Sequence, residues 1–580
     1  MNSNFTKRKE NFPAFVIEHG RRIIDENEEK ANELASRFTS FSPNLSETFK
    51  KRKSLIENQI LNIDAERKYE AVNEPFILEE LVSAVNMMKN STPGPDMICQ
   101  PMITHLPDCA LRFLLNVLNM IWETSTFPKG WTHSLIIPIL KRNEDPSNPG
   151  SYRPISLTSI MCKLMERMVN SRLTWILEKF SIISPLQNGF RKNRSTMDPI
   201  VQLENDIQKG LGNKEATIVC FLDFEKAYDS LYRNAIIYKM QLLGFHGKMI
   251  TWVESFFTNR TIQVRVGNSF SNVLHLDYGV PQGSVISPTL FNIMLNDLSE
   301  IQNTFGVNMS FYADDVALWF SNRNVKYGQK KIQKAMDSVE HWCDTWGMTL
   351  STRKSCVVVF TYKKINETPI RISLAGDILR VESSFKYLGM WFDQKNTWKK
   401  HIEDVINKCK VRMNILRVLT GTDWGADTAT LLMVYRGLIR SKIDYGCTVY
   451  DSAPKYMKDK LDSIQYKCLR IITGAPIATS LDALQMECNE MPLDLRRQYF
   501  IDSLQIHILN QNNDHPLKQL LRPCWQYERL TQEQRRNVMA TRFSTLDSNV
   551  EPFMAIYVGM PFWHLASPTI SFTIKDQFAN

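Results

Sequence analysis

Apolar runs broken by single polar positions predict several short strands in the middle of the chain. Two such runs, residues 307–312 and 316–320, flank the adjacent acids Asp314 and Asp315. Apolar runs on either side of a polar pair are typical of a β-hairpin with the polar side chains at its tip. A third acid, Asp223, sits in another strand-like run over residues 218–224. The pattern therefore predicts three carboxylates on neighbouring strands.

Helical periodicity predicts helices on both sides of this strand-rich region. Residues 17–70 are charged and helix-prone, and residues 76–90 form an amphipathic segment that ends at the turn Pro93-Gly94-Pro95-Asp96. Short strand signals follow at 356–362 and 387–392. Beyond them lies an apolar stripe with Lys and Arg between its members, at Ile402, Ile406, Cys409, Met413 and Leu416.

A turn and a helix lie between the two acidic segments. The turn Gly279-Val-Pro-Gln-Gly283 carries two glycines, which permit close approach of the backbone. Ser287 followed by Pro288 predicts a helix start, with the serine hydroxyl as cap and proline in the first turn. We expect the buried stripe of this helix to consist of Leu290, Phe291, Met294, Leu295 and Leu298.

Composition narrows the class of protein. A length of 580 residues suffices for several cores, and a formal net charge of +9 fits a polyanionic partner, although many proteins are mildly basic. The eleven cysteines form no Cys-x-x-Cys pair, which favours a reducing compartment and argues against structural zinc. The sequence shows neither a signal peptide nor an apolar run of membrane-spanning length. The basic run at residues 50–53 is either a nuclear import signal or a solvated basic helix end.

Adjacent carboxylates by themselves more often mark a solvated turn than a metal site. Two carboxylates repel each other, and a divalent cation relieves that repulsion. Three carboxylates on neighbouring strands match what two Mg²⁺ ions need for nucleotidyl transfer. The remaining motifs decide between these readings.

The ordered motifs at residues 221–229, 279–298 and 312–315 resemble the reverse transcriptases of non-LTR (LINE-type) retrotransposons, and the jockey-like and I-like groups most. The resemblance extends from about residue 28 to about residue 497. It implies an α+β right-hand polymerase fold with fingers, an antiparallel palm sheet and a helical thumb. The implied bounds are an N-terminal helical extension at 1–75, fingers at 76–214, palm with primer-grip region at 215–397, thumb and post-thumb helices at 398–497, and a C-terminal segment of unknown role at 498–580.

The resemblance implies roles for the acidic motif and its neighbours. Asp223 and Asp314 would be the metal-holding pair and Asp315 a more peripheral acid, with Phe224 beside the metal. The implied cofactor is two Mg²⁺ ions, with Mn²⁺ as a substitute. Tyr228 would exclude the 2′-hydroxyl of a ribonucleotide, or else merely cap a palm helix. Asp229 is interpreted as a structural acid at a helix start.

The resemblance also implies a set of nucleotide-binding residues. Lys141 and Arg153, on two strands joined by a polar loop, would hold the triphosphate, although such charges are often only exposed strand ends. Gln282 and Gly283 would cradle the template base and incoming nucleotide, unless their loop serves only as a connection. Lys354 would protonate the pyrophosphate.

Nucleic-acid contacts are implied at two further places. In the segment Gln187-Asn-Gly-Phe-Arg191 and just after it, Arg191, Lys192 and Arg194 would contact template phosphates. Tyr387, Leu388 and Gly389 would belong to a primer-grip hairpin. Tyr435 and the segment at residues 461–484 resemble the post-thumb helices of this family. The resemblance implies no chemical role for them.

The function implied is an RNA-directed DNA polymerase that extends a DNA primer on an RNA template with dNTPs in target-primed reverse transcription. The alternatives are a domesticated or catalytically silent nucleic-acid-binding relic, a viral RNA polymerase and a group II intron maturase. Endonuclease, RNase H and Cys/His knuckle signals are absent, so we expect a polymerase portion whose nick comes from an endonuclease in trans. We expect an intracellular protein of cytoplasm and nucleus, with no membrane association; its oligomeric state is open.

Overall fold

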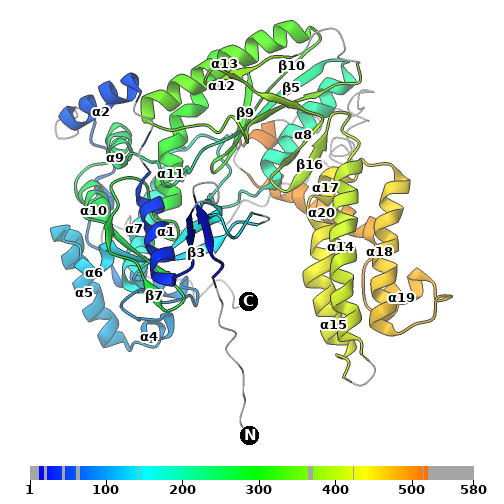
Figure 1. Cartoon of the computed structure of the whole chain (residues 1–580), viewed down its shortest axis with the longest axis horizontal. Coiled ribbons are helices and arrows are strands. Elements are labelled where there is room, and N and C mark those ends of the chain that lie inside the picture. The colour runs from blue at the N-terminus through cyan, green and yellow to red at the C-terminus, as the bar shows by residue number, and fades with distance from the viewer. Residues whose placement is uncertain are drawn as a thin grey trace, which may run out of the picture.

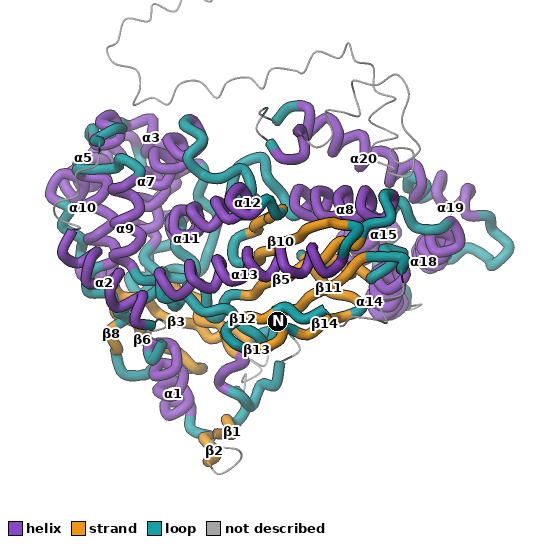
Figure 2. Tube along the Cα trace, turned by 90° about the horizontal axis from the view of Figure 1, so that it is seen from above, coloured by secondary structure: helices purple, strands orange, loops and turns teal. Residues whose placement is uncertain are grey.

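The computed structural model describes residues 12–519 apart from short gaps at 18–21, 42, 44–45, 60–65, 143, 364–369, 422–423, 512 and 514. Helices and strands alternate in a mixed α+β arrangement. Figure 1 shows a large body that contains the two main sheets, and beside it a lobe of long helices. Figure 2 shows the strands labelled β5, β10 and β11 running between covering helices.

The central sheet has five strands in the order β14-β11-β5-β10-β9. Its pairings are antiparallel except for β11 with β14. The strands are β5 (Ala216–Asp223), β9 (Asn308–Tyr312), β10 (Asp315–Asn322), β11 (Cys356–Phe360) and β14 (Arg380–Glu382). The predicted hairpin around the adjacent acids is therefore present as β9 and β10.

Strand β5 is buried from Ala216 to Leu222 because both faces of this sheet are covered. Ile218 and Leu222 pack into a core shared with α13 (Val325–Trp346), whereas Val219 and Phe221 pack into a core shared with α8 (Met197–Gly212). Successive side chains of a strand point to opposite faces, so one strand feeds two cores. This burial fixes the register of β5 and with it the position of Asp223.

A second sheet follows the order β4-β3-β6-β7, with β8 also paired to β6. The predicted pair of strands before the acids is confirmed as the antiparallel strands β3 (His133–Leu140) and β4 (Tyr152–Leu157). The other members are β6 (Thr261–Val266), β7 (Ser269–Phe270) and β8 (Leu274–His275). Helix α1 (Asn27–Thr39) packs on this sheet through Ala31, Leu34 and Ala35.

The helices around the central sheet share one continuous core with it, whereas the second sheet has a smaller core of its own with α1. These helices are α2 (Glu47–Gln59), α3 (Leu78–Asn86), α4 (Gln100–Thr104), α5 (Asp108–Thr124), α6 (Lys129–Thr132), α7 (Ile160–Lys179), α9 (Arg233–Leu242), α10 (Lys248–Phe257), α11 (Ser287–Leu295) and α12 (Glu300–Phe305). The stripe predicted for the helix after Ser287 is buried as expected.

The N-terminal region departs from the all-helical expectation. It begins with the two-stranded sheet β1 (Phe15–Ile17) and β2 (Arg22–Ile24). The amide of Val16 donates to the carbonyl of Ser147, in the loop between β3 and β4, at 3.0 Å. Three-residue strands leave too little periodicity to be recognised, and a distant loop completes their hydrogen bonding.

The basic run at residues 50–53 lies in the first half of α2, not at a helix end. Its Arg52 guanidinium lies 4.8 Å from the ring centroid of Trp346 and 5.3 Å from that of Tyr238. The ammonium group of Lys53 lies 5.7 Å from the ring of Tyr232. Half of the run therefore packs on aromatic rings and attaches α2 to α9 and α13.

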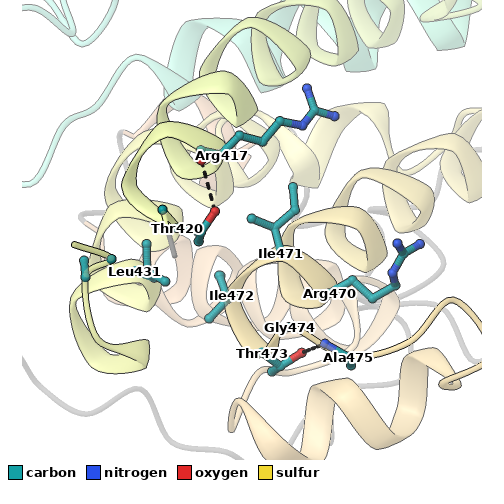
Figure 3. Close-up of a pocket in the computed structure, with 12 residues that line it drawn as sticks. Arg417, Thr420, Leu431, Arg470, Ile471, Ile472, Thr473, Gly474 and Ala475 are labelled. Carbon is teal, nitrogen blue, oxygen red and sulfur yellow. Dashed lines mark hydrogen bonds between the residues drawn. The ribbon is translucent and has the colours of Figure 1, made fainter. Parts of the chain in front are cut away.

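The helical lobe is built on α14 (Lys399–Leu419), whose predicted apolar stripe is buried at all five positions. The remaining helices are α15 (Thr428–Val434), a π-helix (Tyr435–Arg440), α16 (Ser441–Asp444), α17 (Cys447–Tyr450), α18 (Lys455–Thr473), α19 (Leu481–Glu487) and α20 (Leu493–Leu509). Where α14 and α18 end, a cavity of about 690 Å³ opens between Thr420, Leu431 and Thr473 (Figure 3). Most of the segment of unknown role, from residue 520 on, lies outside the described residues.

Candidate active site

Two of the predicted acids lie opposite each other in the central sheet. Asp223 is the last residue of β5 and Asp315 is the first of β10, and the two are direct partners in the antiparallel register. Asp314 precedes Asp315 in the two-residue turn that joins β9 to β10. The strand pairing therefore gathers all three carboxylates at one edge of the sheet.

The turn that carries Asp314 is held by a separate segment of chain. Ala313 has a left-handed backbone conformation, with φ of 56°, and its amide donates to the side-chain oxygen of Gln187 at 3.0 Å. The same oxygen accepts from the amide of Gly189 at 2.8 Å. A Cβ on Gly189 would lie 2.3 Å from the nitrogen of Ala313, so only glycine allows this contact. The predicted template segment thus supports the acidic turn directly.

The carboxylates repel one another. Burial raises the pKa of Asp315 to about 6, and repulsion from Asp314 and Asp223 adds to the shift. Asp315 nevertheless remains exposed to solvent at the start of β10. The pKa of Asp314 is also raised, by burial and by Asp223, while Arg153 and Lys354 oppose the rise.

Cations partly compensate this negative charge. The ammonium group of Lys354 lies 3.1 Å from one carboxylate oxygen of Asp223, an oxygen that is buried and accepts no hydrogen bond. Among the described residues, no group of three or more His, Cys, Asp or Glu side chains has the arrangement of a metal site. Even so, the mutual repulsion and the unsatisfied oxygen are properties that a divalent cation would relieve, so the donor set fits one. Phe224, the other predicted neighbour of a metal, is buried and forms a bridge with Leu350.

Tyr228 is fixed between two aromatic rings close to the acids. Its ring stacks on Phe291 of α11 with centroids 4.6 Å apart, and Phe190 meets it edge-on at 6.5 Å. Burial and the charge of Asp314 raise the pKa of Tyr228 well above its ordinary value. Helix α9 begins at Arg233, so Tyr228 does not cap it. The cap interpretation is therefore wrong, whereas the sugar-discriminating role stays a prediction.

Asp229 was expected at a helix start, and this expectation is wrong. The residue lies in a turn four residues before α9, and its carboxylate accepts a hydrogen bond from the side-chain amide of Gln282 at 3.0 Å. Burial raises the pKa of Asp229 to about 6, and the hydrogen bond from Gln282 opposes that rise. The partner is 53 residues away in sequence, which is why the local pattern suggested a cap instead.

The loop with Gln282 also contacts the second sheet. The carbonyl of Gln282 accepts from the amide of Ser156 on β4 at 2.8 Å. Gly283 has φ of 111°, and a Cβ there would lie 2.9 Å from the carbonyl oxygen of Ser156. Gly279 has φ of 76°, and a Cβ there would collide with the backbone of Asp229. Both glycines are therefore required by the close approach of neighbouring backbone.

The predicted serine cap of α11 is wrong. Ser287 is the first helical residue, and its buried hydroxyl makes no hydrogen bond. The carboxylate of Glu166 on α7 instead accepts hydrogen bonds from the amides of Val285 and Ile286, at 2.6 and 3.3 Å. A buried anion from another helix thus does what a local hydroxyl was expected to do, and no local pattern signals it.

Four cations lie near this acidic region: the charges of Arg153 and Lys354 act on Asp314, and those of Lys141 and Lys226 act on Asp229. Lys141 follows β3 and donates to the carbonyl of Gly150 at 2.9 Å. Burial lowers the pKa of Lys141, and the charges of Lys354, Arg153 and Lys226 lower it further, so these three cations lie within electrostatic reach of Lys141. Lys226 escaped the sequence interpretation, although it stands between two motif residues. Its ammonium group lies 4.8 Å from the ring of Phe41, in the N-terminal region.

The three basic residues expected to contact template phosphates differ in their surroundings. Arg191 is engaged within the protein, because it makes two 2.7 Å hydrogen bonds to Glu178 and a 2.8 Å bond to the carbonyl of Ser184. Arg194 is partly buried, and burial lowers its pKa to about 10. Lys192 is exposed. Of the three, Lys192 is the most accessible to a phosphate.

The expected primer-grip residues form a tight hairpin. Strands β15 (Ser384–Tyr387) and β16 (Met390–Asp393) are joined by Leu388 and Gly389, whose φ values are 45° and 88°. The Tyr387 ring is buried 5.2 Å from that of Phe221 on β5.

The hairpin tip is also tied to the helical lobe. The hydroxyl of Tyr445, from just beyond α16, donates to the carbonyl of Leu388 and lies 3.2 Å from the hydroxyl of Thr196, within hydrogen-bonding distance. Sequence reasoning missed Tyr445, which connects the hairpin to the start of α8.

No helix among the described residues is long and apolar enough to cross a membrane.

The cavity in Figure 3 lies in the helical lobe and is lined by none of the predicted site residues. The candidate site is a charged edge of the central sheet.

Comparison with known proteins agrees with the motifs. Residues 139–392 match the family model described as reverse transcriptase (RNA-dependent DNA polymerase). A probable RNA-directed DNA polymerase from transposon BS of Drosophila melanogaster is 28% identical over 465 residues, covering 79% of this chain and 50% of the relative. The RNA-directed DNA polymerase from mobile element jockey of the same species is 29% identical over 423 residues, covering 70% and 46%.

The chain spans about half the length of these curated relatives. A solved apo telomerase from Candida tropicalis, truncated from its C-terminal domain, matches with a TM-score of 0.32 and 14% identity over 48% of this chain and 58% of that one. The jockey match confirms the predicted likeness to jockey-like elements. In its motifs and in these matches, the chain is similar to the RNA-directed DNA polymerases of transposable elements, and residues 139–392 carry the match to the reverse transcriptase family.

Proposed function

We propose that this chain is an RNA-directed DNA polymerase that extends a DNA primer on an RNA template. The observation that carries the proposal is the pairing of Asp223 with Asp315 across β5 and β10, with Asp314 in the adjoining turn. The loop with Gln282 and four cations border the same edge of the sheet. Carboxylates beside cations suit a reaction in which a hydroxyl attacks the α-phosphorus of a nucleoside triphosphate and pyrophosphate leaves.

The carboxylates of Asp223 and Asp314, with Asp315 and the backbone carbonyl of Phe224 beside them, would hold two Mg²⁺ ions. When bound, such ions lower the pKa of the primer hydroxyl and neutralise charge on the triphosphate. The raised pKa of Asp315 and the unsatisfied oxygen of Asp223 support this assignment. Mn²⁺ would substitute, since oxygen ligands accept both ions.

The protein groups would orient the reactants. Lys141, Arg153 and Lys354 would bind the phosphate oxygens, and Gln282 with Gly283 would contact the nucleotide and the template base. The Tyr228 ring, held by its stack on Phe291, would lie under the sugar and exclude a 2′-hydroxyl.

Nucleic-acid contacts would come from the surrounding segments. Lys192, with Arg191 and Arg194, would lie along the template, and the hairpin tip at Tyr387, Leu388 and Gly389 would support the primer. We assign residues 76–214 to the fingers, 215–397 to the palm and 398–497 to the thumb and post-thumb helices of a right-hand polymerase. Target-primed reverse transcription would then use a nick made by an endonuclease.

Primer extension with purified protein tests the proposal. The reaction contains oligo(dT) on poly(rA), dTTP and Mg²⁺, with the double variant Asp314→Asn/Asp315→Asn beside the wild type. We expect DNA synthesis by the wild type alone, and equal binding of the duplex by both proteins. Binding without synthesis by folded wild-type protein would instead identify a nucleic-acid-binding relic.

A further inference from the structure

One oxygen of the Glu166 carboxylate makes all of its hydrogen bonds to a single loop. This oxygen accepts from the hydroxyl of Ser284 at 2.5 Å and from the amides of Val285 and Ile286 at 2.6 and 3.3 Å. The other oxygen accepts the weaker bond from the thiol of Cys162 at 3.4 Å. These three loop residues directly follow Gln282 and Gly283, so Glu166 fixes the C-terminal end of the loop that carries them.

A buried cation holds the other end of the same loop. The guanidinium group of Arg233 donates to the carbonyls of Tyr278 and Gly279 at 3.1 and 2.8 Å, and to that of Phe257 at 2.9 Å. The side chain has the chemistry that carbonyls require, just as the carboxylate of Glu166 has the chemistry that amides require. Opposite charges therefore hold the two ends of one nine-residue stretch, residues 278–286.

Burial makes these contacts unusually demanding. Glu166 is 0% exposed and Arg233 is 8% exposed. A charge away from water is tolerated only when its hydrogen-bonding capacity is used, so neither residue can be replaced by a neutral one without loss. Arg260, also buried, lies within electrostatic reach of Glu166 and balances its charge.

The loop between these ends touches both sheets. Gln282 bonds to Asp229 after β5 and to Ser156 on β4, so a displacement of the loop would move both contacts. Hydrogen-bonded contacts of this kind transmit a shift of about 1 Å at one point to the groups that bind substrate.

We propose that Glu166 and Arg233 are positioning residues, which fix residues 278–286 and thereby place Gln282 and Gly283 for the incoming nucleotide. The proposal rests on the proposed polymerase function. Neither side chain contacts the nucleotide itself. Their effect is on nucleotide affinity, through the loop.

Glu166→Gln is the test variant, because it keeps the shape of the side chain and removes its charge. Glu80→Gln is the matched control, because Glu80 on α3 is also a buried carboxylate. It accepts two 2.7 Å hydrogen bonds from Arg172, which lies on α7 as Glu166 does. Among the described residues, Glu80 accepts no hydrogen bond from residues 278–286. The readouts are KM for dTTP and kcat in primer extension, the melting temperature, and hydrogen–deuterium exchange of peptides covering 278–286.

We expect Glu166→Gln to raise KM for dTTP by about tenfold while kcat changes by less than about threefold. Exchange of the loop amides should accelerate in the same variant. Glu80→Gln should lower the melting temperature without changing KM or loop exchange. Unchanged KM and exchange in Glu166→Gln, or an equal KM rise in Glu80→Gln, would overturn the proposal.

Two further outcomes are kept separate. If Glu166→Gln does not fold, Ser284→Ala removes one of the three loop donors, and its KM for dTTP should rise by about threefold; no rise refutes the proposal. If the wild type makes no DNA, the polymerase function fails on its own. Loop exchange in the Glu166 variant then still decides whether this carboxylate holds the loop.

Discussion

Replacing Gly283 by alanine tests how closely the loop at residues 279–283 approaches strand β4. The backbone of Gly283 has φ of 111°, where an L-residue is strained by about 2 kcal/mol. The added Cβ would also lie 2.9 Å from the carbonyl oxygen of Ser156. Because backbone cannot rotate away as a side chain can, the loop must shift and weaken the 2.8 Å hydrogen bond from Ser156 to Gln282, at a cost of about 1 kcal/mol.

The expected total is therefore about 3 kcal/mol of lost stability. Gly474→Ala provides the matched control, since Gly474 has φ of 68° but a Cβ there meets no atom within 4 Å. That variant should lose only about 1 kcal/mol, from backbone strain. Urea unfolding followed by tryptophan fluorescence measures both values.

The same pair of variants separates stability from function. Gly283→Ala should raise KM for dTTP in primer extension, whereas Gly474→Ala should leave it unchanged, because Gly474 lies in the helical lobe at the end of α18. Equal stability losses in the two variants, within about 0.5 kcal/mol, together with equal KM values would refute the reasoning about close approach.

Two further predictions concern the site itself. Tyr228→Ala removes the ring that stacks on Phe291, and we expect incorporation of ribonucleotides relative to deoxyribonucleotides to rise by about tenfold or more in competition assays; unchanged selectivity would exclude the gate. In metal-free protein, the pKa of Asp315 is about 6 in the folded state and 3.8 in the unfolded chain, so the folded state binds the proton more tightly. The free energy of unfolding should therefore fall as pH rises from about 4 to about 6. Urea midpoints in EDTA should show this fall in the wild type and a smaller one in Asp315→Asn; parallel curves would contradict it.

The sequence predicted those features that depend on local pattern. Alternating and continuous apolar runs located β5, β9 and β10, because burial on both faces of the sheet requires them. The stripe that begins at Ile402 located α14, because one face of that helix is buried. The order of the motifs then indicated the resemblance to non-LTR reverse transcriptases, which spacing alone could not do.

Contacts between distant segments could not be predicted in this way. Asp229 and Glu166 are acids whose partners lie 53 and about 118 residues away, so a local reading assigned helix-start roles to Asp229 and to Ser287 instead. Arg191 was expected to face a phosphate, yet its pairing with Glu178 depends on how two segments pack. Tertiary packing decides which polar groups meet, and a single sequence carries no direct record of it.

The most direct test of the central claim is single-turnover incorporation of dTMP onto oligo(dT) paired with poly(rA), in the presence of Mg²⁺. Asp223→Asn is compared with Asp337→Asn, an exposed aspartate on α13 whose partner is the side chain of Gln333. We expect the wild type and Asp337→Asn to incorporate the nucleotide at similar rates and Asp223→Asn to be slower by at least about a hundredfold. Equal rates in all three proteins, or no incorporation by folded wild-type protein that binds the duplex, would contradict the account.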